Sequence, residues 1–118
     1  MANILVCDDA MFMRQTLIQI LESAGHTIIG QAQNGVECVE KSKRLNPDII
    51  LMDISMPELD GIEATRRIVT DNPEAKIIMV SAMGLMQKVV EAVEAGARDF
   101  VAKPFEAAKI IECINKYI

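Results

Sequence analysis

The sequence predicts an α/β fold in which a five-stranded parallel sheet, in the order 2-1-3-4-5, is covered by helices on both faces. Strand-like and helix-like segments alternate five times with short connections, which is typical of parallel sheets with right-handed crossovers. Residues 49–52 are four apolar residues in succession, as expected for a strand buried on both faces. In such sheets the ligand crevice lies beyond the carboxyl ends of the strands, where the strand order reverses.

The predicted strands are short and apolar, and two of them lead directly into acidic residues. Asp8-Asp9 follows the first strand, and Asp53 follows the third. Pro57 cannot donate to a sheet ladder, so a loop is expected soon after Asp53. The strands are expected at residues 3–7, 27–32, 49–52, 76–81 and 99–102.

Apolar residues at spacings of three and four predict a helix after each strand. Gly25 and Gly96 close the first and fourth helices, and Pro47 and Pro73 follow the second and third. The apolar positions that mark the five helices include Met13, Leu17 and Leu21, then Cys38 and Leu45, then Ile62 and Ile68, then Val89 and Ala92, and finally Ile110 and Ile114.

Length, charge and composition limit the organisation and the partners of the protein. The chain has 118 residues, and we expect residues 1–118 to form one domain. A net charge of −5 at pH 7 disfavours nucleic acid and anionic membranes as partners. The apolar runs are too short to span a membrane, and the N-terminus lacks a secretory signal pattern, so a cytoplasmic location is expected.

The three cysteines, Cys7, Cys38 and Cys113, are odd in number and widely separated. No pair has the spacing of a metal site or a redox motif. We therefore expect all three to be small buried apolar side chains.

Polar side chains gather at the carboxyl ends of the predicted strands. If the first and third strands are neighbours, the carboxylates of Asp8, Asp9 and Asp53 meet at one edge of the sheet. Two like charges about 4 Å apart repel by roughly 4 kcal/mol at an effective dielectric of about 20, so three of them need a cation. Oxygen ligands without His or Cys suit Mg²⁺, with Mn²⁺ as an alternative. Lys103 adds a second positive charge.

The same residues suit the transfer of a phosphoryl group to a carboxylate. Asp53 is the candidate nucleophile, because a carboxylate can attack phosphorus to form an aspartyl phosphate. Asp9 and Asp53 would hold the metal with help from Asp8, while Ser81 and Lys103 would contact the phosphoryl oxygens. Any one aspartate alone could equally cap a helix or a turn. The five residues together favour phosphoryl transfer.

Over its whole length the sequence resembles the receiver domain of two-component response regulators, which has a flavodoxin-like fold. The run from Asp8 to Arg14 makes it most similar to the single-domain chemotaxis regulators of that family. The residues that carry the resemblance are Asp8-Asp9, Asp53 with Met56-Pro57 and Asp60-Gly61, Ser81-Ala82, and Lys103-Pro104-Phe105.

The resemblance implies a phospho-accepting signalling switch rather than an enzyme. A CheA-like sensor histidine kinase would transfer a phosphoryl group from its phosphohistidine to Asp53, and water would later remove it with the domain's own assistance. The implied Mg²⁺ ligands are Asp8, Asp9, Asp53 and the backbone carbonyl of Ser55.

The resemblance also implies how the signal leaves the domain. Ser81 would move toward the phosphoryl group while Phe100 turns inward, and the Lys103-Pro104 peptide would be cis. The phosphorylated monomer would bind another protein, such as the flagellar motor switch. The expected contact residues are Leu85, Met86, Val89, Phe100 and Ala102.

Two residues depart from the family pattern. Phe100 stands where the chemotaxis regulators carry Tyr, so it has no hydroxyl to offer a partner. Met83 is apolar where the family often has a charged residue. For that reason the resemblance does not fix the lifetime of the phosphoryl group.

Other functions stay open on the sequence alone. The domain could be a phosphorelay intermediate, or a receiver that acts on an enzyme or a transcription factor. A small aspartyl-phosphate hydrolase would need a second acid two residues after the nucleophile, where Ser55 stands. A flavin carrier is disfavoured because the first strand leads into acids instead of a loop of hydroxyls and glycines.

Overall fold

The structure is a computed structural model that describes residues 1–82 and 86–118, apart from the side chain of Met86. Three sequence-based expectations lie outside the described residues. They concern Met83, Leu85 and the contact expected of the Met86 side chain.

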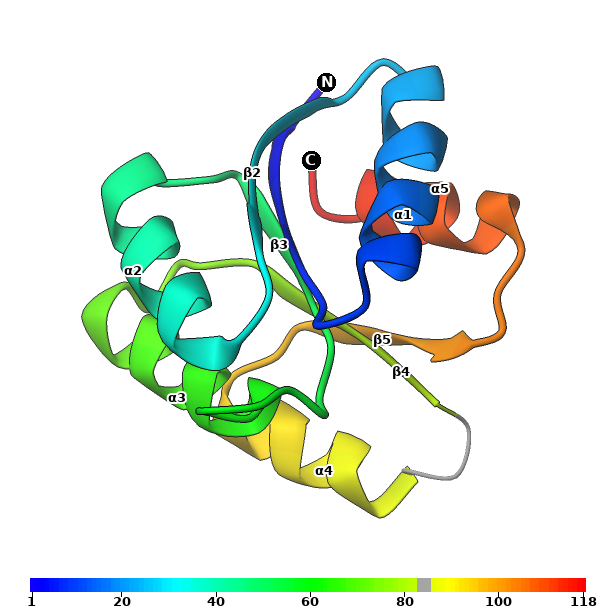
Figure 1. The fold of residues 1–118 in the computed structure, drawn as a ribbon. Helices are drawn as coiled ribbons and strands as arrows, with labels where there is room; N and C mark the ends of the chain where they lie inside the picture. The colour runs from blue at the N-terminus through cyan, green and yellow to red at the C-terminus, as the bar shows by residue number, and fades with distance from the viewer. Residues whose placement is uncertain (83–85) are drawn as a thin grey trace.

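Five parallel strands form one sheet in the order β2-β1-β3-β4-β5, which confirms the predicted topology (Figure 1). The two central neighbours, β1 and β3, pair from Ile4 with Ile49 to Cys7 with Met52. This register brings the carboxyl ends of both strands to the same edge of the sheet. The strands are β1 (Asn3–Cys7), β2 (Thr27–Ala32), β3 (Ile49–Met52), β4 (Ile77–Ala82) and β5 (Asp99–Lys103).

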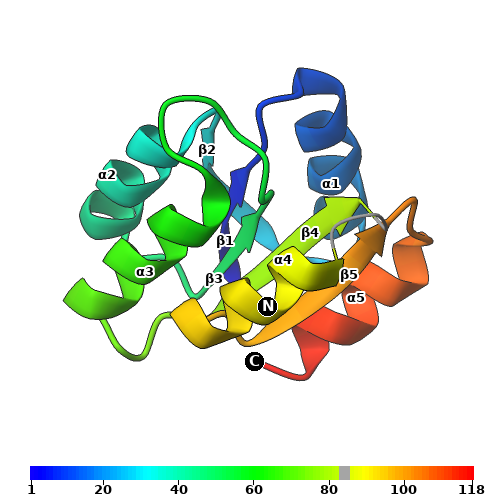
Figure 2. The same cartoon turned by 90° about the horizontal axis from the view of Figure 1, so that it is seen from below.

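Helices cover both faces of the sheet, as the alternation of segments predicted. Helices α1 and α5 pack on one face, and α2, α3 and α4 pack on the other (Figures 1 and 2). Each helix follows its strand at the carboxyl edge and returns the chain to the amino edge. The helices are α1 (Met11–Ser23), α2 (Gly35–Leu45), α3 (Gly61–Asp71), α4 (Met86–Ala95) and α5 (Ala107–Asn115).

The sheet separates two apolar cores. Side chains alternate along each strand, so Leu5 of β1 and Ile50 of β3 pack toward α2, α3 and α4, while Ile4 and Leu51 pack toward α1 and α5. All four β3 residues are at most 2% exposed, as the apolar run predicted. This burial anchors the strand that ends at Asp53.

Side chains cap α2 and α3, two of the helices that begin at the carboxyl edge of the sheet. The Asn34 side chain accepts a hydrogen bond from the Glu37 backbone N–H (2.8 Å), and the Asp60 side chain accepts one from Glu63 (2.9 Å). Such caps satisfy backbone donors that the first turn of a helix leaves unpaired. They fix where α2 and α3 start.

The loop between β3 and α3 depends on a glycine. The Gly61 N–H donates to the carbonyl of Ile54 (2.7 Å), and a Cβ at position 61 would lie 2.0 Å from the carbonyl oxygen of Asp53. Only glycine allows the start of α3 to pack this close to the end of β3. At the other side of the edge, the Lys103-Pro104 peptide is cis, as the resemblance implied.

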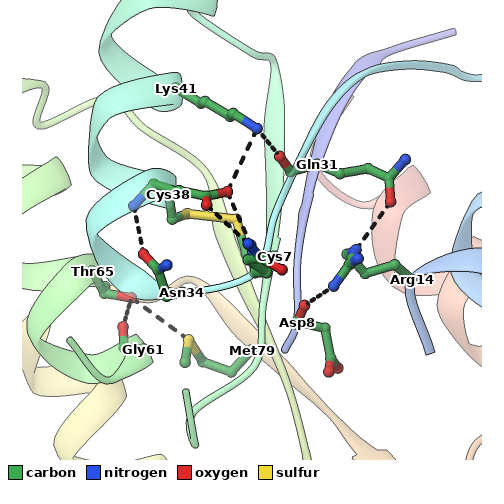
Figure 3. The surroundings of a disulfide bond; sticks show 12 residues. Cys7, Asp8, Arg14, Gln31, Asn34, Cys38, Lys41, Gly61, Thr65 and Met79 are labelled. Carbon is green, nitrogen blue, oxygen red and sulfur yellow. Dashed lines mark hydrogen bonds and ion pairs between the residues drawn. A yellow bond between two sulfur atoms is a disulfide. The ribbon is translucent and has the colours of Figure 1, made fainter. Parts of the chain in front are cut away.

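The expectation for the cysteines was wrong for two of the three. Cys7 and Cys38 are buried, but they are joined in a disulfide between the end of β1 and the first turn of α2 (Figure 3). Cys113 is a free buried thiol, as expected. The two bonded residues are 31 positions apart, and only the crossover from β1 through β2 to α2 brings their Cα atoms to 6.2 Å. The number of residues between two cysteines does not indicate how far apart they lie in the folded protein.

Among the helices that the structure describes, none has the length and apolar character needed to cross a membrane.

Replacing Gly61 with Ala is expected to destabilise the protein by more than about 2 kcal/mol, because the new methyl group would overlap the Asp53 main chain. Urea unfolding measures the loss. Gly30→Ala is the matched control, since a Cβ there would meet only the terminal methyl groups of Leu45 and Leu5, which can shift more easily than backbone, and a smaller effect is expected. Equal stabilities for the two variants would contradict the close packing of α3 against β3.

Candidate functional site

Three carboxylates meet at the carboxyl edge of the sheet. One oxygen from each of Asp8, Asp9 and Asp53 can be chosen so that all three lie within 4.8 Å of one another. Asp8 and Asp53 are buried, with 1% and 7% of their surface exposed, while Asp9 is exposed. The site therefore has a closed side and an open side.

Backbone hydrogen bonds fix the two buried aspartates. The Asp53 N–H donates to the carbonyl of Cys7 (2.9 Å), and the Asp8 N–H donates to the carbonyl of Ala32 (3.0 Å). The Asp8 carboxylate also accepts the N–H of Ala10 (2.9 Å). The ends of β1, β2 and β3 are thus tied together directly beneath the acidic cluster.

Lys103 brings the positive charge that the sequence predicted. Its Nζ lies 2.8 Å from Oδ2 of Asp8 and 3.6 Å from Oδ1 of Asp53. The lysine side chain is 20% exposed, so this charge is only partly screened by solvent. In this state the ammonium pairs mainly with Asp8.

The pKa of the Asp53 carboxyl group is raised by its surroundings. Its burial, followed by the negative charge of Asp8, raises the pKa of Asp53 from the ordinary value of 3.8 to about 6. The charge of Lys103 and a hydrogen bond from the Ser55 backbone act in the opposite direction but do not cancel the rise. One lysine is therefore insufficient to neutralise the cluster.

Ser81 lies near the end of β4, where it pairs with Ala102 of β5. The residue is fully buried, and its hydroxyl has no hydrogen-bond partner among the residues that the structure describes. A buried hydroxyl without a partner costs free energy, so such groups usually serve a purpose. A donor held ready for an incoming oxygen is one such purpose.

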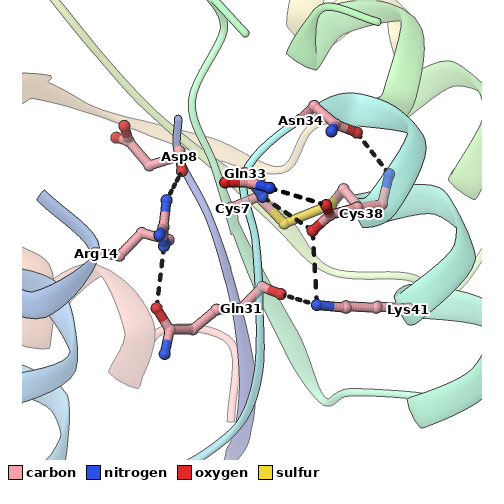
Figure 4. A network of polar contacts seen from close by, with 9 residues as sticks. Cys7, Asp8, Arg14, Gln31, Gln33, Asn34, Cys38 and Lys41 are labelled. Carbon is pink, nitrogen blue, oxygen red and sulfur yellow. Dashed lines mark hydrogen bonds and ion pairs between the residues drawn. A yellow bond between two sulfur atoms is a disulfide. The ribbon is translucent and has the colours of Figure 1, made fainter. Parts of the chain in front are cut away.

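Sequence reasoning missed Arg14. This α1 residue is only 9% exposed, and its guanidinium donates to the backbone carbonyl of Asp8 (2.7 Å) and to the side chain of Gln31 (3.0 Å) (Figure 4). Its position in the sequence could have indicated this burial, because Arg14 is three residues before Leu17 and seven before Leu21, on the buried face of the helix. A cation on the inward face of a helix needs an acceptor, and Asp8 supplies one.

The expected partner face is only partly exposed. Val89, Phe100 and Ala102 are all of intermediate exposure, and Phe100 packs against the core beneath α2, α3 and α4. Among the described side chains of α4, the exposed apolar ones are Val90 (59%) and Val93 (53%), neither of which was expected on this face. A pocket of about 450 Å³ lies between β5 and α5, and its lining includes Phe100 and Ala102.

The donor set fits a hard divalent cation. Mg²⁺ takes oxygen ligands at about 2.1 Å in octahedral geometry, so neighbouring ligand oxygens lie roughly 3 Å apart and opposite ones roughly 4 Å apart. The three carboxylate oxygens already lie within 4.8 Å of one another. Burial and the charge of Asp8 raise the pKa of Asp53, so a bound cation would favour its charged form. Ser55, two residues beyond Asp53, is exposed in the adjoining loop.

Comparison with known proteins places this site in a family. The family model described as the response regulator receiver domain matches residues 4–115. The chain belongs to this family. Its members act as signalling switches, and the acidic cluster described above lies within the matched region.

The chain is similar to several chemotaxis proteins. It is 50% identical to the chemotaxis protein CheY of Thermotoga maritima and 48% identical to that of Bacillus subtilis, in each case over 97% of this chain and 95% of the relative. Among solved structures, it matches a CheX–CheY–BeF₃–Mg²⁺ complex from Borrelia burgdorferi with a TM-score of 0.91 and 38% identity. That match covers 97% of this chain and 87% of the other. The response regulator domain of Thermotoga maritima CheB gives a TM-score of 0.90 at 37% identity, over 98% and 94% of the two chains.

Asp53→Asn is expected to stabilise the metal-free protein at pH 7.5 by about 1–3 kcal/mol, because it removes a carboxylate whose pKa folding raises from 3.8 to about 6. A raised carboxyl pKa means that the folded state loses stability as the pH rises from about 4 to 6. The gain of the variant should therefore shrink toward zero below pH 4. Urea unfolding with a chelator present, at several pH values, measures it.

Asp71→Asn is the control, because this exposed acid pairs with the exposed Lys43 and its loss should change little. If Asp53→Asn and the wild type were equally stable from pH 4 to pH 7.5, the raised pKa assigned to Asp53 would be contradicted.

Proposed function

We propose that this receiver domain accepts a phosphoryl group on Asp53 from the phosphohistidine of a sensor histidine kinase. The supporting observation is the gathering of Asp8, Asp9 and Asp53 within 4.8 Å, with Lys103 beside them, at the carboxyl edge of the sheet. The residues proposed to hold Mg²⁺, or Mn²⁺ in its place, are Asp8, Asp9, Asp53 and the backbone carbonyl of Ser55.

The chemistry is a displacement at phosphorus. An oxygen of Asp53 attacks the phosphorus while the bond to the imidazole nitrogen of the donor breaks, and the phosphoryl group passes to the carboxylate. A bound divalent cation supplies charge neutralisation for the phosphoryl oxygens and for the acidic cluster. The protein contributes mainly position and charge, since this type of transfer needs little else.

The side chains around Asp53 divide these tasks. Lys103 lies 3.6 Å from Asp53 and can turn from Asp8 toward a phosphoryl oxygen. The unpartnered hydroxyl of Ser81 can donate to another oxygen. The hydrogen bond from the Asp53 N–H to the Cys7 carbonyl holds the nucleophile in place while the charge around it changes.

The proposed pathway is chemotaxis. The chain covers nearly the full length of relatives named chemotaxis protein CheY, and it resembles them at 44–50% identity. In this role a CheA-like kinase is the donor and a downstream protein, such as the flagellar motor switch, is the receiver of the signal in the cytoplasm. A phosphorelay intermediate, or a regulator of an enzyme or a transcription factor, would use the same site with another partner.

Phosphorylation is proposed to act by changing the face formed by α4, β5 and α5. Ser81 and Phe100 lie on the adjacent strands β4 and β5, and Phe100 is only partly buried. Attraction of the Ser81 hydroxyl to a phosphoryl oxygen would alter the space available to Phe100. A partner that binds the altered face better than the resting face would then be favoured by phosphorylation.

Incubation with acetyl phosphate and Mg²⁺ is expected to add one phosphoryl group, because Asp53 offers a positioned carboxylate and acetyl phosphate supplies a high-energy donor. Intact-mass spectrometry detects the added group, and hydroxylamine should remove it, as it removes acyl phosphates. Asp53→Asn should abolish the modification, while Asp71→Asn, which changes an exposed acid far from the site, should leave it intact.

Phosphorylation that persists in Asp53→Asn would contradict the assignment of the acceptor. Steady release of phosphate from a phosphomonoester by the wild type would instead favour the hydrolase alternative. Ser55 stands where such an enzyme needs its second acid, so no such turnover is expected.

Beryllofluoride with Mg²⁺ is expected to shift the NMR signals of Phe100 in the wild type, because it mimics a phosphoryl group on a carboxylate and should recruit Ser81. Ser81→Ala should bind the analogue but show a smaller shift at Phe100, since it lacks the hydroxyl. His26, whose Nδ1 accepts the Ala2 N–H at the amino edge of the sheet, provides a reference signal. Phe100 signals that do not change in the wild type would remove this residue from the switch.

A further inference from the structure

The Cys7–Cys38 disulfide lies directly behind the acidic cluster. It joins the last residue of β1 to the first turn of α2, and both sulfur-bearing residues are at most 1% exposed (Figure 3). Their Cα separation of 6.2 Å is in the range that disulfides require. Nothing in the proposed phosphoryl transfer uses this bond.

Cys7 is connected to two of the three carboxylates through the backbone. It directly precedes Asp8 in the chain, and its carbonyl accepts the N–H of Asp53 (2.9 Å). A displacement of Cys7 would therefore move Asp8 through the chain and Asp53 through this hydrogen bond. The position of the sulfur bond and the geometry of the acidic cluster are mechanically linked.

Cys38 is held just as firmly on the α2 side. Its N–H donates to the carbonyl of Asn34 (3.1 Å), whose side chain caps the helix at Glu37. Around the disulfide, Lys41 donates to the carbonyl of Gln31, and the Gln31 side chain accepts from Arg14, which in turn donates to Asp8 (Figure 4). The disulfide therefore lies beside a chain of hydrogen bonds that runs from Lys41 to Asp8 at the edge proposed to bind the metal.

We propose that Cys7 and Cys38 form a reversible thiol–disulfide site, whose exchange partner is a low-molecular-weight thiol and its disulfide, and that the oxidised form holds the acidic cluster in its metal-binding geometry. This coupling rests on the function proposed above. Intracellular disulfides are more often regulatory than structural, and this pair lies where a regulatory bond can act on the site.

The exchange is balanced with glutathione as the partner. One cysteine thiolate attacks a sulfur of oxidised glutathione, which forms a mixed disulfide and releases one glutathione thiolate. The second cysteine thiolate then attacks the protein sulfur of the mixed disulfide and releases the second. The protein loses two electrons and two protons, and oxidised glutathione becomes two reduced molecules. Because both cysteines are buried, the start of α2 must open for exchange, so the reaction is expected to be slow.

Reduction should loosen the cluster without unfolding the protein. Reduction removes the covalent tie between the end of β1 and the first turn of α2. Cys7 then has more freedom to move, and Asp8 and Asp53 move with it through the chain and through the Asp53 N–H bond to the Cys7 carbonyl. Mg²⁺ demands near-ideal ligand geometry, so its affinity should fall. The apolar core around both residues still accepts two thiols, which behave as small hydrophobes.

The first measurement is the redox equilibrium itself. The protein is incubated to equilibrium over a series of ratios of reduced to oxidised glutathione, acid-quenched, alkylated and weighed by mass spectrometry. The expected result is a transition from three alkylated thiols to one, the remaining thiol being Cys113. Three alkylated thiols at every ratio would overturn the proposal.

The second measurement compares function in the two redox states. Oxidised wild type is expected to bind Mg²⁺ several-fold more tightly in calorimetric titration, and to take up phosphoryl from acetyl phosphate faster at low Mg²⁺, than the reduced wild type. Cys38→Ala should match the reduced form under all conditions, and Cys113→Ala should respond like the wild type. The reduced wild type itself provides the comparison if Cys38→Ala does not fold.

The two proposals fail in different ways. Equal Mg²⁺ affinity and equal phosphorylation in both redox states would overturn the coupling and leave the phosphoryl-accepting function intact. Absence of Mg²⁺ binding and of phosphorylation in both states would overturn the function, and the coupling with it, whatever the thiol count shows.

Discussion

The mutual repulsion of three carboxylates at one edge of the sheet is the constraint on which the rest of this structure depends. Asp8 and Asp53 are buried, where repulsion is poorly screened, and Lys103 compensates for only part of it. Burial of Asp53, followed by the negative charge of Asp8, raises the pKa of Asp53 to about 6. An edge with this imbalance suits a further cation. In the proposed function, a phosphoryl group arrives together with that cation, which would give the switch its physical basis.

The fold bears this electrostatic cost because its stabilising contacts lie elsewhere. The β1 and β3 strands are almost completely buried between two helical layers, and apolar burial is the main source of stability in such a domain. Backbone hydrogen bonds from Asp8 and Asp53 then transfer that rigidity to the acidic edge. Gly61 allows α3 to pack against the end of β3, so the loop that carries Ser55 is held against the same edge.

Helices α1 and α2 each make one contact that fixes the end of β1 beside the acidic cluster. Arg14 fixes the backbone of Asp8 from α1, and the Cys7–Cys38 bond fixes the preceding residue from α2. The two contacts approach β1 from opposite faces of the sheet. The position of the acidic pair is therefore set jointly by both helical layers, and a change in either layer can reach the geometry of the acidic cluster.

The sequence by itself determined the alternation of strands and helices, the burial of β3 and the placement of acids at strand ends. These features follow from hydrophobic periodicity and from Gly and Pro, which act within a few residues of each position. Only the tertiary structure decided that Lys103 pairs more closely with Asp8 than with Asp53, that Ser81 lacks a hydroxyl partner among the described residues, and that Cys7 meets Cys38. These are distances between segments far apart in the chain, and they depend on how the crossovers stack, which local pattern does not encode.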